Sequence, residues 1–178
     1  RLAPPNAAER LRAIFADPEP ITGAIARLPQ TLVHGDVWGP NLGWLPATKS
    51  APRRERQALL LDWALALAGP VTYDPLWLCG GWHALDSRRV LACYRMFLER
   101  YLRGRGVSLP PTTWLALVDA GYLRTALTCG EAFGRAAEEA PAGRTRWIAE
   151  ARVRWWAERA AQAADRLLAG YPPSRVSA

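Results

Sequence analysis

The segment 112–133 is apolar on nearly every side, and this feature limits the possible folds more than any other part of the chain. Apolar residues recur there every three or four positions, and between Trp114 and Cys129 the only charged residues are Asp119 and Arg124. A helix that is apolar all round lies among other elements that cover each of its faces. We therefore predict a helical bundle with this segment in its middle.

Helical patterns also fill most of the remaining chain, and each has a recognisable start. Asn6 and Glu9 suit a capping box, and Thr22 can cap a short helix that Pro29 would stop. Asp74 before Pro75 is an N-cap pair, and Asp86 or Ser87 can cap the helix after it. The predicted helices cover about 7–16, 22–28, 74–80, 87–103, 112–133 and 144–169.

Two of these helices carry apolar stripes that indicate which side faces the core. In the helix at 87–103 the stripe comprises Val90, Tyr94, Phe97, Leu98 and Tyr101. In the helix at 144–169 the residues expected to point inward are Ile148, Trp155 and Leu167.

Three extended runs precede residue 74. Residues 31–33 are β-branched or apolar, the run 42–45 resumes the extended pattern after a polar turn, and the apolar run 58–61 ends at Asp62. Their length and context predict strands, the last of them buried, with 46–57 as a solvated connection. The fold is therefore expected to be α+β, with a small antiparallel strand set and a mostly helical remainder.

The chain of 178 residues carries a charge of +7, and Lys49 is the only lysine among its 23 basic residues. Its arginines are scattered over helix faces and form no block, which disfavours nucleic-acid binding. Cys79, Cys93 and Cys129 are odd in number and widely spaced, which favours buried, reduced thiols in a cytoplasmic protein. His83 shows no ligand spacing and is assigned to packing. No apolar run is long enough to span a bilayer, so no membrane partner is expected.

The segment from His34 to Asn41, together with Asp62, carries the clearest sign of chemistry. In phosphoryl transfer a protein mainly holds Mg²⁺ on the nucleotide phosphates and places the acceptor hydroxyl in line. A kinase loop supplies an aspartate for the hydroxyl, an asparagine five residues later for the metal, and a second aspartate after the next strand. Asp36, Asn41 and Asp62 have this order. Pairing of the runs 42–45 and 58–61 would place Asp62 beside Asn41.

Each of these residues also has a purely structural interpretation. Asp36 and Asn41 are common turn residues, and His34 can be a packed loop histidine. Asp74 is fully explained as a helix cap. Asp62 is harder to explain in this way, because an unpaired carboxylate at the end of an apolar strand is costly without a cation.

The segment 28–77 resembles the family of aminoglycoside phosphotransferases, choline kinases and fructosamine kinases. The resemblance is carried by His34-Gly35-Asp36, Asn41, Asp62-Trp63, Gly69-Pro70 and Asp74. It implies a kinase-like fold and transfer of the ATP γ-phosphoryl group to a hydroxyl of a small molecule. It also implies that Asp36 is catalytic, that Asn41 and Asp62 bind Mg²⁺, and that His34 and Asp74 support the catalytic loop. It assigns no substrate-binding residue.

The resemblance implies a second lobe that the chain does not match. Enzymes of this kind have an N-terminal lobe with a glycine-rich turn over the nucleotide and a strand lysine that binds its phosphates. Here Lys49 follows the loop instead, and the chain begins without methionine. We therefore expect 1–178 to be a single C-terminal lobe whose partner is the missing nucleotide lobe. Its expected parts are a helical lead-in (1–30), the catalytic loop and metal-binding strands (31–74), a helical subdomain (75–170) and a tail (171–178).

The alternative function is a non-catalytic remnant or regulatory lobe that keeps the fold and binds a ligand or partner. For an enzyme, the acceptor is the least constrained part. A polycationic aminoglycoside would need an acidic pocket, whereas the local acidic group of Glu131, Glu138 and Glu139 is diluted by Arg135. This composition disfavours aminoglycosides as acceptors.

Overall fold

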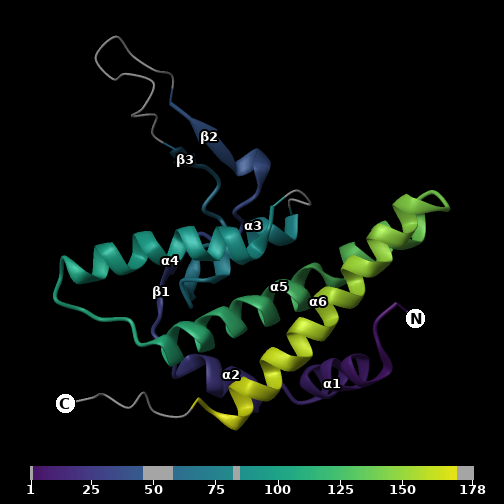
Figure 1. Cartoon of the computed structure of the whole chain (residues 1–178), viewed down its shortest axis with the longest axis horizontal. Helices are drawn as coiled ribbons and strands as arrows, with labels where there is room; N and C mark the ends of the chain where they lie inside the picture. Colours follow the sequence, from purple (N-terminus) through teal and green to yellow (C-terminus); the bar gives the residue numbers. More distant parts are fainter. Residues whose placement is uncertain (1, 46–57, 82–84, 172–178) are drawn as a thin grey trace.

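The computed structural model describes residues 2–45, 58–81 and 85–171, which form a mostly helical structure with short strands (Figure 1). Its mixture of helices and small antiparallel sheets confirms the predicted α+β fold. The helices are α1 (Pro5–Ala16), α2 (Glu19–Ala26), α3 (Tyr73–Gly81), α4 (Ser87–Arg103), α5 (Pro111–Glu139) and α6 (Arg144–Ala169). The strands are β1 (Thr31–Val33), β2 (Leu42–Trp44), β3 (Ala58–Leu60) and β4 (Leu67–Gly69), with a 3₁₀ turn η1 (Gly39–Asn41) before β2.

Some sequence predictions fall outside the described residues. These are the solvated connection 46–57 with Lys49, the packing of His83, and the tail from residue 172 onward. No helix in the described ranges is long and apolar enough to cross a membrane.

Helices α5 and α6 form the centre of the molecule. They run antiparallel and side by side (Figure 1), as the short connection 140–143 requires. α5 buries large side chains such as Leu117 and Leu123, and α6 buries the small residues Ala160, Ala163 and Ala164. α3 packs on α5, and α1 and α2 pack on α6, so the predicted central position of the 112–133 segment is confirmed.

The strands form two separate antiparallel pairs in the described part of the chain, β1 with β4 and β2 with β3. Leu32 lies opposite Ala68, and Leu42 lies opposite Leu60. The pairing of β2 with β3 is the one expected from the sequence. The sequence does not predict β4, because its three residues lie within an uninterrupted apolar run that shows no alternation.

β3 differs from the prediction in its burial. The run 58–61 was expected to be a buried strand, but Ala58, Leu60 and Leu61 are exposed. Figure 1 shows β2 and β3 projecting away from the helices. A two-stranded pair without a layer packed on it leaves its apolar side chains in solvent.

The first two helices do not begin at their predicted caps. α1 begins at Pro5, and the Asn6 side chain accepts a hydrogen bond from the Ala7 backbone N–H (2.9 Å) rather than forming a capping box. α2 begins at Glu19, so Thr22 lies inside it and its hydroxyl donates to the Glu19 carbonyl (3.0 Å). Both capping predictions are wrong. A proline in the first turn fixes φ in advance and has no N–H that needs a partner.

The ranges of α4 and α6 agree with the sequence, but several predicted inward side chains face solvent. Asp86 caps α4 as expected, accepting a hydrogen bond from the Arg88 backbone N–H (2.9 Å). Phe97 and Tyr101 of the α4 stripe are exposed, and so is Ile148 of α6. α4 packs mainly on α3, which covers only part of the stripe.

The three cysteines are free thiols with different exposures. Cys79 is buried, Cys129 is partly buried, and Cys93 on α4 is exposed. The prediction of buried thiols is therefore wrong for Cys93, because α4 is covered on one side only.

Candidate active site

Asp74 fixes the start of the loop that carries Asp36. Its two carboxylate oxygens accept hydrogen bonds from the backbone N–H groups of His34 (2.8 Å) and Gly35 (2.9 Å). α3 begins at Tyr73, so Asp74 lies in its first turn and is not the N-cap that the sequence predicts. A carboxylate in the first turn of a helix is favoured by the helix dipole, and here it also satisfies two loop donors.

His34 connects the same loop to the strand that precedes Asp62. The ring is fully buried, and its Nε2 lies 2.8 Å from the Leu61 carbonyl oxygen. The Asp36 backbone N–H donates to Nδ1 (3.3 Å), so this ring nitrogen acts as an acceptor toward the loop. The ring also contacts Trp63, with 4.6 Å between ring centroids. These contacts give His34 a structural position behind the loop.

Gly35 is the residue at which the loop turns. Its φ is +85°, a conformation that side-chain-bearing residues rarely adopt. A Cβ at this position would lie 2.2 Å from the backbone oxygen of Leu65. The close approach of two backbones therefore requires glycine immediately before Asp36.

Asp36 and Asn41 lie in direct contact. The Asn41 side-chain amide donates to the Asp36 carboxylate Oδ2 and to the Asp36 backbone carbonyl, both at 3.0 Å. The other carboxylate oxygen accepts a hydrogen bond from the Trp77 indole N–H (3.2 Å). Both carboxylate oxygens of Asp36 are therefore held by hydrogen bonds. Each oxygen has more than one lone pair, so Asp36 can still accept a hydrogen bond from a further donor. The Asn41 amide nitrogen faces Asp36, so its oxygen is the atom left to bind a cation.

Asp62 comes immediately after Leu61, whose backbone contacts the Asp36 loop. The backbone N–H of Leu61 donates to the Asn41 carbonyl (2.9 Å), and the Leu61 carbonyl is the partner of His34. Asp62 has φ of 59°, in the left-handed region that aspartate tolerates better than most residues. Its exposed carboxylate accepts a hydrogen bond from the Ala64 backbone N–H (3.3 Å).

Arg124 is a residue of this region that the sequence analysis did not assign. It extends from α5, and its Nη2 donates to the Gly35 carbonyl (3.0 Å). The guanidinium lies 4.9 Å from the ring centroid of Tyr73 and 5.1 Å from that of Trp77, the residue bonded to Asp36. The signal for it was present, because Arg124 is one of only two charged residues between Trp114 and Cys129, and a charge in apolar surroundings needs partners.

The oxygen donors of the loop and of Asp62 are of the kind that suits a hard divalent cation. Asp36, Asn41 and Asp62 offer carboxylate and amide oxygens, which Mg²⁺ prefers, and Mg²⁺ commonly takes its other ligands from phosphates and water. No cluster of three or more His, Cys, Asp or Glu side chains in the described ranges could hold a metal by itself.

Comparison with models of protein families finds a match to the phosphotransferase enzyme family over residues 2–115. The matched range covers more than half of the chain and includes the Asp36 loop, Asp62 and Asp74, so the chain belongs to this family. The family expected from the sequence is thereby confirmed. Searches of curated proteins and of solved structures returned no significant match.

Proposed function

We propose that this chain carries the catalytic site of an ATP-dependent kinase that phosphorylates a hydroxyl group of a small molecule. The observation that supports it most is the Asp36 carboxylate, which both Asn41 and Trp77 hold in place on a loop anchored by Asp74. Phosphoryl transfer depends mainly on such positioning, because the protein does little covalent chemistry.

In this proposal each residue has one role. Asp36 binds the acceptor hydroxyl, orients it toward the phosphorus atom and accepts its proton. Asn41 and Asp62 hold Mg²⁺ through their side-chain oxygens. When bound, the metal neutralises charge on the ATP phosphates. Arg124 and Asp74 position the loop through hydrogen bonds to its backbone groups. His34 holds the segment that precedes Asp62 against the loop.

The proposal includes a nucleotide-binding lobe as the partner of this surface. Large apolar side chains are exposed around the loop and on the neighbouring strands: Trp38, Trp44, Leu60, Leu61, Trp63, Leu65 and Leu67. Such an apolar surface favours contact with another protein layer. We also place the enzyme in the cytoplasm as part of this proposal, because its three cysteines are unpaired.

The test is phosphoryl transfer by the complete gene product, with Mg·ATP and a panel of sugars, amino alcohols, aromatic alcohols and aminoglycosides. Asp36→Asn should keep the hydrogen-bonding shape of the side chain and slow transfer by roughly 10²- to 10⁴-fold. Asp17→Asn, a change at an exposed aspartate after α1, is the matched control and should leave the rate unchanged. Transfer by Asp36→Asn within a few-fold of wild type would contradict the assigned role.

A further inference from the structure

Two charged residues lie between Trp114 and Cys129 of α5, and the structure compensates them very differently. Asp119 forms a bidentate pair with Arg166 of α6. Arg124 forms no ion pair with the described residues, and its Nη1 is buried without a hydrogen-bond partner among them. A partly buried cation without a carboxylate partner is costly, so the position of Arg124 calls for a functional reason.

The Arg124 guanidinium lies against two aromatic rings of α3. It is 4.9 Å from the ring centroid of Tyr73 and 5.1 Å from that of Trp77. These two positions are four residues apart, so they share one face of the helix. Both distances are in the range of cation–π attraction, which is strongest for an indole ring. The rings therefore take the place of a counter-ion.

The close packing of α3 on α5 holds this arrangement together. A Cβ at Gly121, three residues before Arg124, would lie 2.9 Å from the backbone oxygen of Thr72, just before α3. A Cβ at Gly80 of α3 would lie 2.6 Å from Cγ2 of Thr125, the residue after Arg124. Glycine thus permits the close approach of the two helices at both places. Helices packed in this way leave the guanidinium and the rings little freedom to separate.

The Trp77 ring connects Arg124 to the proposed catalytic carboxylate. Its indole N–H donates to Asp36 Oδ1 (3.2 Å), while the Asn41 amide holds Oδ2. A cation on the face of an indole draws electron density from the ring, which makes the N–H a stronger donor. A stronger donor holds the carboxylate more firmly in one orientation. Arg124 thus acts on Asp36 without a hydrogen bond to it.

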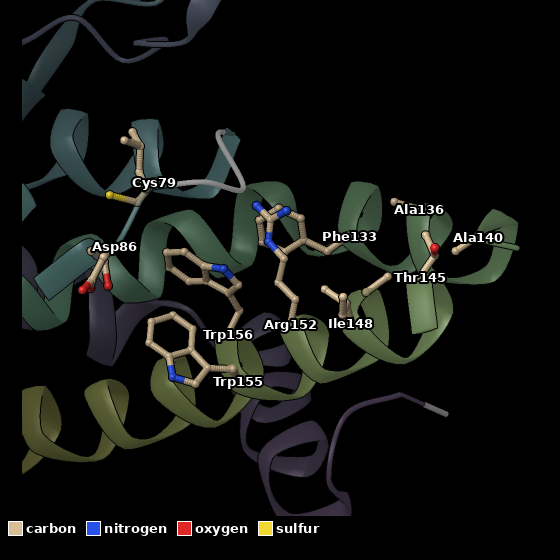
Figure 2. Close-up of a pocket in the computed structure, with 13 residues that line it drawn as sticks. Cys79, Asp86, Phe133, Ala136, Ala140, Thr145, Ile148, Arg152, Trp155 and Trp156 are labelled. Atoms are coloured by element: carbon tan, nitrogen blue, oxygen red, sulfur yellow. The ribbon is translucent and has the colours of Figure 1, made fainter. Parts of the chain in front are cut away.

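Another arginine lies on a ring that has no polar hydrogen. Arg152 of α6 lies 4.6 Å from the ring centroid of Phe133, at the edge of a cavity of about 580 Å³ (Figure 2). Phe133 has no N–H or O–H group, so this contact ends at the ring. The contact of Arg124 differs because it continues through Trp77 to Asp36.

We propose that Arg124 is a positioning residue that acts on Asp36 through the Trp77 indole, by strengthening the hydrogen bond that orients the carboxylate. Its part in phosphoryl transfer rests on the proposed kinase function. The coupling among the three side chains does not, and it can be measured without nucleotide or acceptor.

The first experiment is NMR spectroscopy of the indole N–H groups in the ¹⁵N-labelled chain. The Trp77 signal is the one that disappears in Trp77→Phe. In Asp36→Asn, which offers a weaker neutral acceptor, its proton should move upfield and exchange with solvent at least about fivefold faster. Arg124→Met should speed this exchange about two- to fivefold. A Trp77 signal that neither variant alters would overturn the inference.

The matched control for Arg124 is another arginine that lies on a tryptophan ring. Arg159 is 5.6 Å from the ring centroid of Trp155, and both residues belong to α6. Arg159→Met therefore removes the same kind of contact away from the Asp36 loop. It should leave both the exchange of the Trp77 N–H and the rate of transfer unchanged, and an effect as large as that of Arg124→Met would overturn the inference.

The second experiment measures transfer by the complete gene product with an acceptor from the panel above. Trp77→Phe keeps the ring and removes the donor, and it should lower kcat about tenfold with both KM values within about twofold. Arg124→Met should lower kcat about tenfold in the wild-type background and about threefold or less in the Trp77→Phe background. The remaining effect belongs to its bond with Gly35. Equal factors in both backgrounds would show that Arg124 does not act through Trp77.

The two experiments separate this inference from the proposed function. No transfer by the wild-type gene product to any alcohol would overturn the kinase function, and with it the role of Arg124 in transfer. Transfer that neither Trp77→Phe nor Arg124→Met slows would overturn the inference and leave the kinase function in place. Arg124→Lys keeps a cation beside the rings and should retain at least about a third of the rate. A fall as large as in Arg124→Met would contradict the role of the charge.

Discussion

Two residues with left-handed backbone conformations set the directions of the two carboxylates in the site. Gly35 precedes Asp36 with φ of +85°, and Asp62 itself has φ of 59°. This region costs an ordinary L-residue roughly 1–2 kcal/mol, glycine pays none of this penalty, and aspartate is more often found there than most residues. The surrounding contacts must therefore hold the local strain at Asp62, and strained residues of this kind cluster at functional sites.

At the residue scale, Gly35→Ala should disrupt the loop. The new Cβ would lie 2.2 Å from the Leu65 carbonyl oxygen, so the backbone must shift as well as adopt an unfavourable φ. We expect a loss of about 1–3 kcal/mol in the free energy of unfolding and a marked fall in transfer. Gly39→Ala is the control, because a Cβ there meets nothing within 4 Å. Urea unfolding checks the prediction, and equal stability of the two variants would contradict it.

Asp62→Asn separates the charge of the side chain from its backbone conformation. Asparagine also tolerates the left-handed region, so the fold should lose little stability, whereas Asp62→Ala would add strain of roughly 1–2 kcal/mol. Without the negative charge, the Mg²⁺ concentration for half-maximal transfer should rise at least about tenfold. The measurement is a Mg²⁺ titration at saturating ATP. An unchanged midpoint would remove Asp62 from the metal site.

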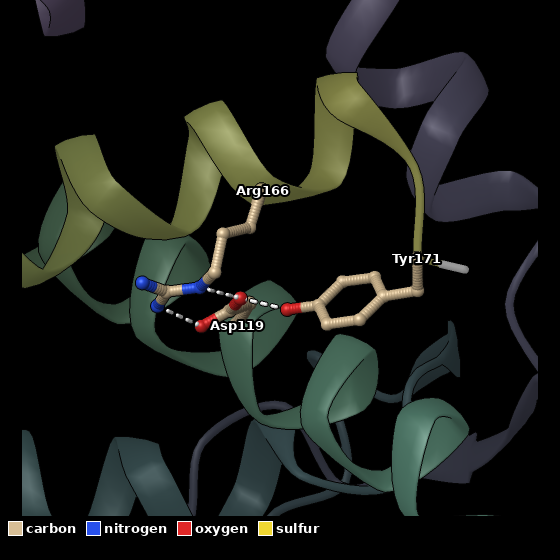
Figure 3. Close-up of polar contacts among 3 residues, drawn as sticks. All are labelled: Asp119, Arg166 and Tyr171. Carbon is tan, nitrogen blue, oxygen red and sulfur yellow. Dashed lines mark hydrogen bonds and ion pairs between the residues drawn. The ribbon is translucent and has the colours of Figure 1, made fainter. Parts of the chain in front are cut away.

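At the scale of elements, a buried carboxylate joins the two central helices. Asp119 of α5 is almost fully buried and pairs with Arg166 of α6 through two hydrogen bonds of 2.6 and 2.7 Å (Figure 3). It also accepts a hydrogen bond from the hydroxyl of Tyr171, just beyond α6. The bidentate pair satisfies the charge that burial would otherwise penalise, and it fixes the end of α6 against α5.

Substitutions around Asp119 should lower the free energy of unfolding more, the more unpaired buried charge they leave. Asp119→Ala should lower the free energy of unfolding by about 2–4 kcal/mol, since Arg166 is half exposed and regains some water. Tyr171→Phe removes one hydrogen bond and should cost about 1 kcal/mol. Asp165→Ala, which breaks the more exposed pair with Arg10, should cost less than about 1 kcal/mol. Chemical unfolding gives the ranking, and equal losses for Asp119→Ala and Asp165→Ala would contradict it.

Elements with long apolar periodicity were predictable from the sequence, and short ones were less so. The start and end of α6 agree with prediction because its pattern extends over many turns. β4 has only three residues, and its pairing with β1 depends on a contact about 35 positions away. The predicted first residue of a helix was wrong where a proline in the first turn stands in place of a side-chain cap, as at Pro5. α4 packs against other helices on one side, which explains why its apolar stripe is less buried than the sequence predicts.

The sequence predicted that Asp36 and Asn41 lie in one loop, but it did not predict most of the contacts that hold this loop. The spacing of Asp36 and Asn41 indicated a shared site, and the structure places them in hydrogen-bonding contact. Asp74 illustrates the difficulty, because Asp before Pro predicts a cap, whereas its carboxylate bonds to the loop across about 40 residues. Arg124 reaches the loop from α5 over a still longer separation. Such contacts depend on how helices pack, which local patterns do not encode.

At the scale of the whole molecule, two of the three cysteine thiols lie among the packed helices. Burial raises the pKa of both the Cys79 thiol and the Cys129 thiol from 9.0 to about 11. Burial also raises the pKa of Tyr73 and Tyr94. The folded chain therefore holds protons at alkaline pH that the unfolded chain releases, which couples its stability to pH.

The stability of the chain should fall as pH rises above about 9. A raised pKa in the folded state contributes fully below the unfolded value of 9.0, and the contribution is lost as pH approaches about 11. Urea unfolding from pH 7 to pH 11 should show a plateau followed by a decline. The double variant Cys79→Ala, Cys129→Ala should decline less steeply, because only the tyrosines still titrate in this way. Cys93→Ala, which changes the exposed thiol, should reproduce the wild-type slope. A double variant with an unaltered slope would show that the two buried thiols do not set the alkaline limit.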